Sequence, residues 1–156
     1  MKQSRNESKS ERAQHAKPVG MTAAAGFQIG VRRTLPSTVQ QAWSLLISPE
    51  GMKLWIGEVD KLELKPGQTF AAAGGITGEF RVVKPPEQLR MRWKLPGWEH
   101  PSTLQIRVLP AAQGKATVSF HQEKLEDMSA REAMKSRWEE VLANLRELAD
   151  QMGSNK

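Results

Sequence analysis

The chain has 156 residues, of which 38% are hydrophobic, and a formal net charge of +6. This length fits one domain with a hydrophobic core, and the apolar content excludes a chain that is disordered throughout. Cysteine is absent, which excludes disulfides, thiolate metal sites and a cysteine nucleophile. Tyrosine is also absent and the three histidines are scattered, so no metal or other cofactor is expected. No apolar run approaches the ~20 residues of a membrane span, so no transmembrane segment is expected.

Much of the positive charge lies at the start of the chain. The first 20 residues hold five Lys and Arg against two Glu, and few of them are apolar. Such a composition buries too little surface to offset the entropy of ordering. The sequence therefore predicts a disordered basic tail over residues 1–24, followed by one folded domain over residues 25–153. The tail has no continuous apolar stretch, so no secretory signal is expected and the protein is predicted to be cytoplasmic.

The folded part is expected to begin with one strand and two short helices. Apolar and polar residues alternate over residues 27–31, which predicts a strand with one buried face. Ser37 and Gln40 have the spacing of a capping box, which predicts the start of a helix with one apolar side. Pro49 suits the first turn of a second short helix over residues 49–55.

The middle of the chain, residues 59–124, consists of short alternating segments separated by turn signals, which predicts an antiparallel meander. One signal is the Pro-Gly pair at residues 66–67, which suits the centre of a type II turn. A strand is expected on each side of that turn, the first with Leu62 and Leu64 facing inward. Near the end of the meander, the same alternation points Gln122 inward.

The last element is a long amphipathic helix. Ser129 and Glu132 form a second capping-box pattern, and apolar residues from Met134 to Met152 keep helical spacing. A helix over residues 130–152 would be about 35 Å long, enough to cross a whole sheet. The order of elements predicts an α+β fold: a curved antiparallel sheet of about six or seven strands, two short helices and one long C-terminal helix.

A series of short segments, spread over residues 27–150, carries a recognisable combined pattern. They are VQQAW (39–43), SPE (48–50), LW (54–55), LKPGQTF (64–70), GEF (78–80), LRMRW (89–93), VSFHQ (118–122) and WEEVLANL (138–145). In this order they resemble the START-like (SRPBCC) superfamily, whose helix-grip fold wraps a curved sheet around a long C-terminal helix. Within it, the chain is most similar to the family named after the activator of the heat-shock protein ATPase. One departure is Arg137, where many relatives have glycine before the helix Trp.

The resemblance implies binding of a lipid, polyketide or other hydrophobic small molecule, although a fold alone does not fix a function. The first hypothesis is therefore a non-catalytic binder with a cavity between the sheet and the C-terminal helix, where apolar walls meet one polar anchor. Gln122 is the expected anchor, because its amide both donates and accepts hydrogen bonds. The expected wall consists of Trp55, Phe70, Phe80, Met91, Trp93, Ile106, Phe120, Met134 and Trp138. The alternative for these residues is that they only fill the core.

A second hypothesis is an enzyme of the cyclase or hydratase type, as found elsewhere in the superfamily. Such an enzyme needs an acid or base in the cavity, and the inward positions offer almost none. Glu58, Asp60, Glu99 and His100 can line a rim, but their spacing matches no catalytic motif. No catalytic residue is therefore assigned, and catalysis is not expected.

A third hypothesis is a protein-interaction or co-chaperone-like module that acts through the outer face of the sheet. Several basic residues have outward positions on adjacent strands and can attract an acidic protein partner. No aromatic residue accompanies them for base stacking, and Glu79 dilutes the charge, so nucleic acid is not an expected partner. The alternative is a merely solvated face. The basic residues are Arg81, Arg90, Arg92, Lys94 and Arg107.

Overall fold

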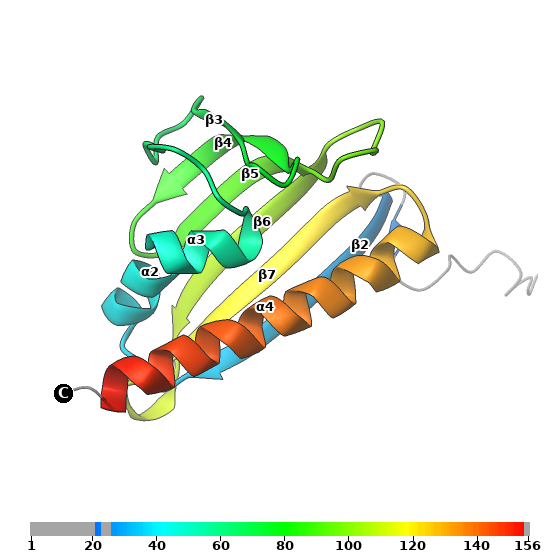
Figure 1. Cartoon of the computed structure of the whole chain (residues 1–156). Helices are drawn as coiled ribbons and strands as arrows, with labels where there is room; N and C mark the ends of the chain where they lie inside the picture. Colours follow the sequence, from blue (N-terminus) through cyan, green and yellow to red (C-terminus); the bar gives the residue numbers. More distant parts are fainter. Residues whose placement is uncertain (1–20, 23–25, 155–156) are drawn as a thin grey trace, which may run out of the picture.

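The computed structural model describes residues 21–22 and 26–154. Its elements, in chain order, are β1 (Met21–Thr22), β2 (Gly26–Leu35), α2 (Val39–Ile47), α3 (Pro49–Trp55), β3 (Thr69–Ala71), β4 (Thr77–Lys84), β5 (Gln88–Lys94), β6 (Ser102–Pro110), the short 3₁₀ helix η2 (Ala112–Gly114), β7 (Ala116–Leu125) and α4 (Met128–Ser154). They form two layers, with α2, α3 and α4 on the same face of one sheet (Figure 1).

Within the described residues, the sheet has seven strands in the order β1-β2-β7-β6-β5-β4-β3. Every neighbouring pair is antiparallel. Strands β3 to β7 form a meander, and β2 joins it by pairing with β7 at the far side. Cross-strand partners share a face, so Ile106 lies beside Phe120 on one strand and Leu89 on the other. The predicted α+β architecture is confirmed.

The first helix begins one residue later than the sequence predicted. Thr38 is the N-cap: its hydroxyl accepts a hydrogen bond from the Gln41 amide, and the Gln41 side chain accepts one from the Thr38 amide. The predicted pair Ser37 and Gln40 is therefore wrong by one position. The sequence contains two overlapping capping-box patterns, one starting at Ser37 and one at Thr38. The first helical hydrogen bond runs from the Ala42 amide to the Thr38 carbonyl, so the second pattern is the one that forms.

The long helix α4, in contrast, begins two residues earlier than predicted, at Met128. The Asp127 carboxylate accepts a hydrogen bond from the Ala130 amide at 2.8 Å, and the Asp127 carbonyl accepts one from the Arg131 amide. Aspartate is as good a cap as serine, so the acidic residue just before Met128 takes the role assigned to Ser129. The helix packs mainly along β2 and also contacts β7 (Figure 1).

The strand expected around Leu62 and Leu64 is wrong. Residues 57–68 form a loop in which both leucines are half-buried against the core. Among the described residues, β3 is the edge strand and pairs with β4, and the segment before it does not add a further strand to that edge. The turn that follows is confirmed: Gln68 donates to the Lys65 carbonyl, and Gly67 has a φ of +89°.

The predicted tail lies almost entirely outside the described residues. Residues 1–20 and 23–25 are not described, but Met21 and Thr22, which fall within the predicted tail, form strand β1. Met21 pairs with Phe27 and Thr22 with Gly26. The sheet therefore begins a few residues before the predicted start of the domain.

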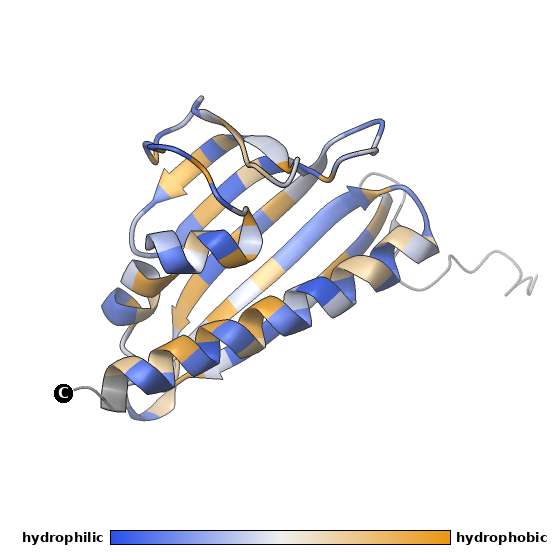
Figure 2. Cartoon of the chain, viewed as in Figure 1, coloured by the Kyte–Doolittle hydropathy of each residue, from blue (hydrophilic) through white to orange (hydrophobic). Residues whose placement is uncertain are grey.

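The core lies between the sheet and the helices. The apolar stripe of α4 faces the sheet and its polar side faces away (Figure 2). Trp138, Leu142 and Leu145 on this stripe are at most 1% exposed, whereas Met152, predicted to continue the stripe, is 51% exposed. None of the helices in the described part of the chain combines the length and hydropathy needed to cross a bilayer.

Candidate functional site

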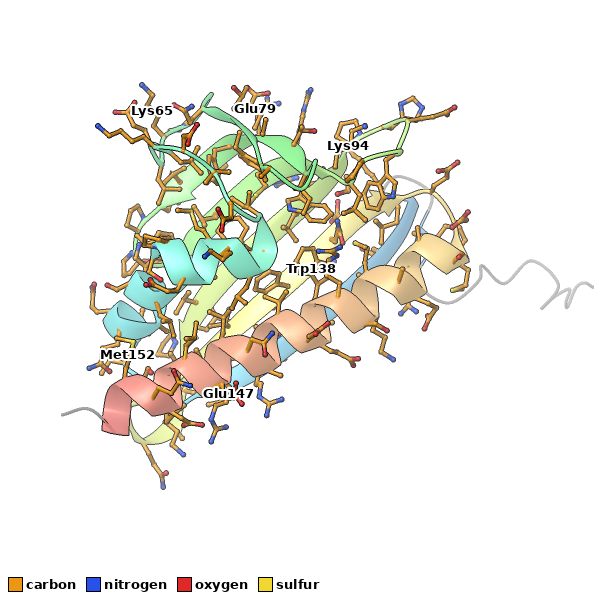
Figure 3. The ribbon with its side chains drawn as sticks, in the orientation of Figure 1. Lys65, Glu79, Lys94, Trp138, Glu147 and Met152 are labelled. Carbon is orange, nitrogen blue, oxygen red and sulfur yellow. The ribbon has the colours of Figure 1, made fainter. Side chains whose placement is uncertain are left out.

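An aromatic cluster occupies the space between the sheet and α4. At its centre is Trp93 on β5, whose ring meets Trp138 of α4 edge-on with centroids 5.1 Å apart. Trp98, in the loop after β5, meets the same ring at 5.9 Å, and the Arg137 guanidinium lies 5.8 Å from its centroid. Figure 3 shows Trp138 between α4 and the sheet. Such ring contacts each contribute about 0.5–1.5 kcal/mol beyond burial.

One polar chain crosses this apolar layer. The Trp138 indole donates to the Gln122 side-chain oxygen at 2.7 Å, and the Gln122 amide donates to the Ser102 hydroxyl at 2.8 Å. The Ser102 hydroxyl donates in turn to the Trp93 carbonyl at 2.6 Å. Among the described residues, Gln122 and Ser102 are the buried polar side chains. Each has a protein partner, which removes the cost of burying it.

The ten predicted site residues all come together in the interior. The apolar ones belong to one core cluster, and Gln122 faces into it as predicted. Phe70 packs on Phe80 with ring centroids 5.2 Å apart, and Phe120 packs on Trp138 at 5.0 Å. The exposed fraction is 0% for eight of the ten, which are Trp55, Phe80, Met91, Trp93, Ile106, Phe120, Gln122 and Trp138. Because water reaches none of their surface, these eight side chains fill the space they share.

Space for a ligand lies at one end of this cluster. A surface pocket of about 250 Å³ is bounded by Trp98 and Leu125, with the first turns of α4 forming another side. Because Trp98 also contacts Trp93, it separates the pocket from the buried cluster. The residues lining the pocket are Trp98, Glu99, His100, Lys124, Leu125, Glu126 and Ala130.

The four rim residues considered for catalysis fall into two separate places. Glu99 and His100 line the pocket beside Trp98, and both are exposed. Glu58 and Asp60 line a different surface pocket beside α3, and Glu58 pairs with Lys53 at 3.4 Å. The structure therefore does not bring the four together. Within residues 21–22 and 26–154, His, Asp and Glu form no cluster of three that could hold a metal ion.

Two residues of the site were missed by the sequence analysis. Ser102 shares the inward parity of Leu104 and Ile106 on β6, so extending the alternation by one step would have found it. Trp98 lies in a loop with no periodicity, and nothing in its local sequence indicates that it packs on Trp93. The alternation along β6 was a sufficient signal for Ser102, and no such signal exists for Trp98.

A curved antiparallel sheet that holds a long C-terminal helix defines a helix-grip protein of the START-like (SRPBCC) superfamily. Residues 36–150 match the family described as "Activator of Hsp90 ATPase homolog 1-like protein", and the chain belongs to this family. The family expected from the sequence is thus confirmed.

Several solved structures share the fold. Protein MLL2253 from Mesorhizobium loti is 21% identical, with a TM-score of 0.69 over 80% of this chain and 97% of that one. PFC0360w, an HSP90 activator from Plasmodium falciparum, is 17% identical, with a TM-score of 0.66 over 78% and 94%. DynU16, from the dynemicin biosynthetic locus, is 17% identical, with a TM-score of 0.70 over 79% of this chain and 47% of DynU16. This chain therefore spans about half of DynU16. No curated protein matches the chain.

Proposed function

We propose that this protein binds a hydrophobic small molecule, without turnover, between the inner face of the sheet and α4. The observation that carries the proposal is a surface pocket at the end of the aromatic cluster, which only the half-buried Trp98 ring separates from Trp93. Large apolar walls with a few polar groups are typical of small-molecule sites. The occurrence of the fold in DynU16, a protein of a biosynthetic locus, supports a small-molecule role.

The route into the site passes Trp98. The pocket of about 250 Å³ is below the range of about 300–1,000 Å³ typical of small-molecule sites, so a larger ligand must displace this side chain. Trp98 is half-buried, and its ring contact with Trp93 adds about 0.5–1.5 kcal/mol to the burial of its apolar surface, so it is held less firmly than a fully buried ring. Displacing the fully buried Trp93 or Trp138 would instead disrupt the core. Opening therefore occurs at the loop of residues 95–101.

The chemistry of the interior supports binding rather than catalysis. The buried polar side chains of the described residues are Gln122 and Ser102, an amide and a hydroxyl already bonded to protein groups. A general acid or base must lie within hydrogen-bond reach of the reacting group. Glu99 and His100 are exposed at the pocket rim, on the solvent side of Trp98. A bound molecule beneath Trp98 would thus meet the apolar surface of Trp93 and Leu125.

The test uses a neutral hydrophobic dye, N-phenylnaphthylamine, whose fluorescence rises in apolar surroundings. Ala130 lines the pocket from α4 and is half-buried against the core, so Ala130→Trp places a large ring at the pocket. Ala133→Trp makes the same change at an exposed position of the same helix, and serves as the matched control. We expect the folded protein to bind the dye, Ala130→Trp to weaken binding by about tenfold, and Ala133→Trp to leave it unchanged.

Two outcomes would overturn the proposal. One is that the folded protein, with a cooperative thermal transition, fails to bind the dye. The other is that Ala130→Trp and Ala133→Trp bind it equally well, which would place the dye elsewhere. A neutral dye is chosen because a charged one would also respond to the basic residues of the surface.

A further inference from the structure

The outer face of the sheet carries a basic hollow that the proposed ligand site does not use. It has a volume of about 460 Å³ and lies on the face opposite the helices. Four of its seven lining residues are cations and none is acidic. The basic hollow is lined by Arg81, Val82, Arg90, Met91, Arg92, Thr103 and Lys124.

Two irregularities of the sheet bring cations to the basic hollow. On β4, the register shifts between Phe80 and Val82, so Arg81 is an extra residue opposite β5. On β7, the pairing with β2 shifts next to Lys124, which has the left-handed φ of 65°. Bulges re-aim side chains and occur often beside functional sites, and a non-glycine residue with positive φ is costly. Two independent bulges thus place a basic residue at the same hollow.

The four cations have no acidic partner among the described residues. Arg92 is opposite Glu79 on β4 and Thr103 on β6, yet no ion pair joins Arg92 to Glu79. Arg90 and Arg92 are two residues apart on β5 and lie on the same face, so their backbone positions are about 6.7 Å apart along the strand. Like charges at such spacing repel each other. An anion in the basic hollow would relieve this repulsion.

The positive charge continues beyond the hollow along the outer face. Arg107 pairs with Gln88, which puts it diagonally beside Arg90 at about 7–8 Å. Arg32, on β2, pairs with Ser119 in the same row of the sheet as Arg107. Between Arg90, Arg107 and Arg32 the partner groups are amides and a hydroxyl, whereas Glu123, opposite Thr103, lies 3.7 Å from His121. This spread suits an extended polyanion rather than a single small anion.

We propose that the basic hollow and the cations beside it dock an acidic segment of another protein. Guanidinium groups bind carboxylates in a two-pronged geometry, and Arg81, Arg90 and Arg92 offer three of them on one surface. The described residues of the basic hollow include no aromatic side chain on which a nucleic-acid base could stack. Residues 1–20 of this chain are themselves basic, so they do not complement the surface. The partner is therefore a separate acidic chain.

The experiment measures binding of a fluorescent peptide of alternating glutamate and serine to the full chain, by anisotropy at low ionic strength. The test variant is Arg90→Gln with Arg92→Gln, two exposed positions on one strand. The control is Lys61→Gln with Lys135→Gln, which removes the same charge from exposed positions away from the hollow. We expect the test variant to weaken binding by at least about tenfold and the control to change it by less than about twofold. Added salt should weaken binding to the unaltered chain.

Three results would overturn the proposal. The first is that the peptide does not bind. The second is that both double variants lose binding equally, which would mean that only net charge matters. The third is that single-stranded oligothymidylate or vesicles containing phosphatidylserine bind the hollow more tightly than the peptide. The N-phenylnaphthylamine assay on the Arg90→Gln, Arg92→Gln protein checks that the inner face is intact. Because that dye reports on the inner face, failure here is distinguishable from failure of the ligand-binding proposal.

Discussion

The inner and outer faces of the sheet use the same strands in opposite ways. On β5, Leu89, Met91 and Trp93 are 0% exposed and belong to the core, whereas Arg90 and Arg92 between them are exposed. Successive residues of a strand point to opposite faces, so one short segment contributes to both surfaces. Core packing and surface charge are thus carried by alternating residues and can be changed separately by substitution.

The two faces also differ in how their polar groups are satisfied. On the inner face, Gln122 and Ser102 are each hydrogen-bonded within the protein. On the outer face, Arg81, Arg90 and Arg92 have no ion-pair partner in the described part of the chain. Buried polar groups must be paired, whereas exposed cations are solvated and remain available. The polar groups of the inner face are therefore satisfied within the protein, whereas the outer cations are exposed to solvent.

The largest effect should come from Trp138 at the centre of the inner layer. Trp138→Ala should lower the free energy of unfolding by about 3–5 kcal/mol, because it leaves a cavity and removes the donor to Gln122. Urea denaturation at equilibrium measures the change. Glu139→Ala, exposed on the other side of α4, should change it by less than about 0.5 kcal/mol. Equal losses from both variants would contradict the assignment of the inner face.

The alternation on β5 predicts a sharp contrast between adjacent residues. Met91→Ala should cost about 2–5 kcal/mol of unfolding free energy, because its side chain is fully buried. Arg92→Ala, one residue further on, should cost less than about 0.5 kcal/mol. Thermal unfolding followed by circular dichroism compares the two. A loss of unfolding free energy for Arg92→Ala as large as that for Met91→Ala would contradict the assignment of these two residues to opposite faces.

A smaller contrast is expected between two glutamines of matching chemistry. Gln122→Leu should lower the free energy of unfolding by about 1–3 kcal/mol, because the Trp138 indole and the Ser102 hydroxyl lose a buried partner. Gln105→Leu removes a bond to Gln88 on the outer face, where water can replace it. Guanidinium denaturation should show the smaller loss at Gln105. If Gln105→Leu proves the more costly, the outer face is more ordered than its exposure indicates.

The smallest effect is expected from the charge repulsion between Arg90 and Arg92 on the outer face. Arg90→Gln should raise the free energy of unfolding by about 0.2–0.5 kcal/mol at low ionic strength, because it relieves repulsion from Arg92. The gain should vanish at high salt, where exposed charges are screened. Urea titrations at the two ionic strengths measure the difference. A gain that persists at high salt would have a cause other than charge.

Local patterns in the sequence were enough to predict the inner layer. The alternation of β5 and β7 placed Trp93, Phe120 and Gln122 on one face, and the helical spacing placed Trp138 toward them. These assignments depend only on the period of the backbone, which is two in a strand and about 3.6 in a helix. The same periods failed at Leu62 and Leu64, because alternation alone cannot supply a neighbouring strand to pair with.

The sequence alone was enough to predict most of the elements and which of their residues turn inward, because these follow from short-range periodicity and turn chemistry. The family followed from the resemblance carried by the ordered series of short motifs. Only the tertiary structure decided that Trp98 covers Trp93 and that Gln122 is bonded to Ser102 and Trp138. It also decided that the two bulges turn basic side chains to one hollow. The Gln122 bond and the bulges depend on the register between paired strands, and the position of Trp98 depends on how its loop folds back onto β5, and no local pattern encodes either.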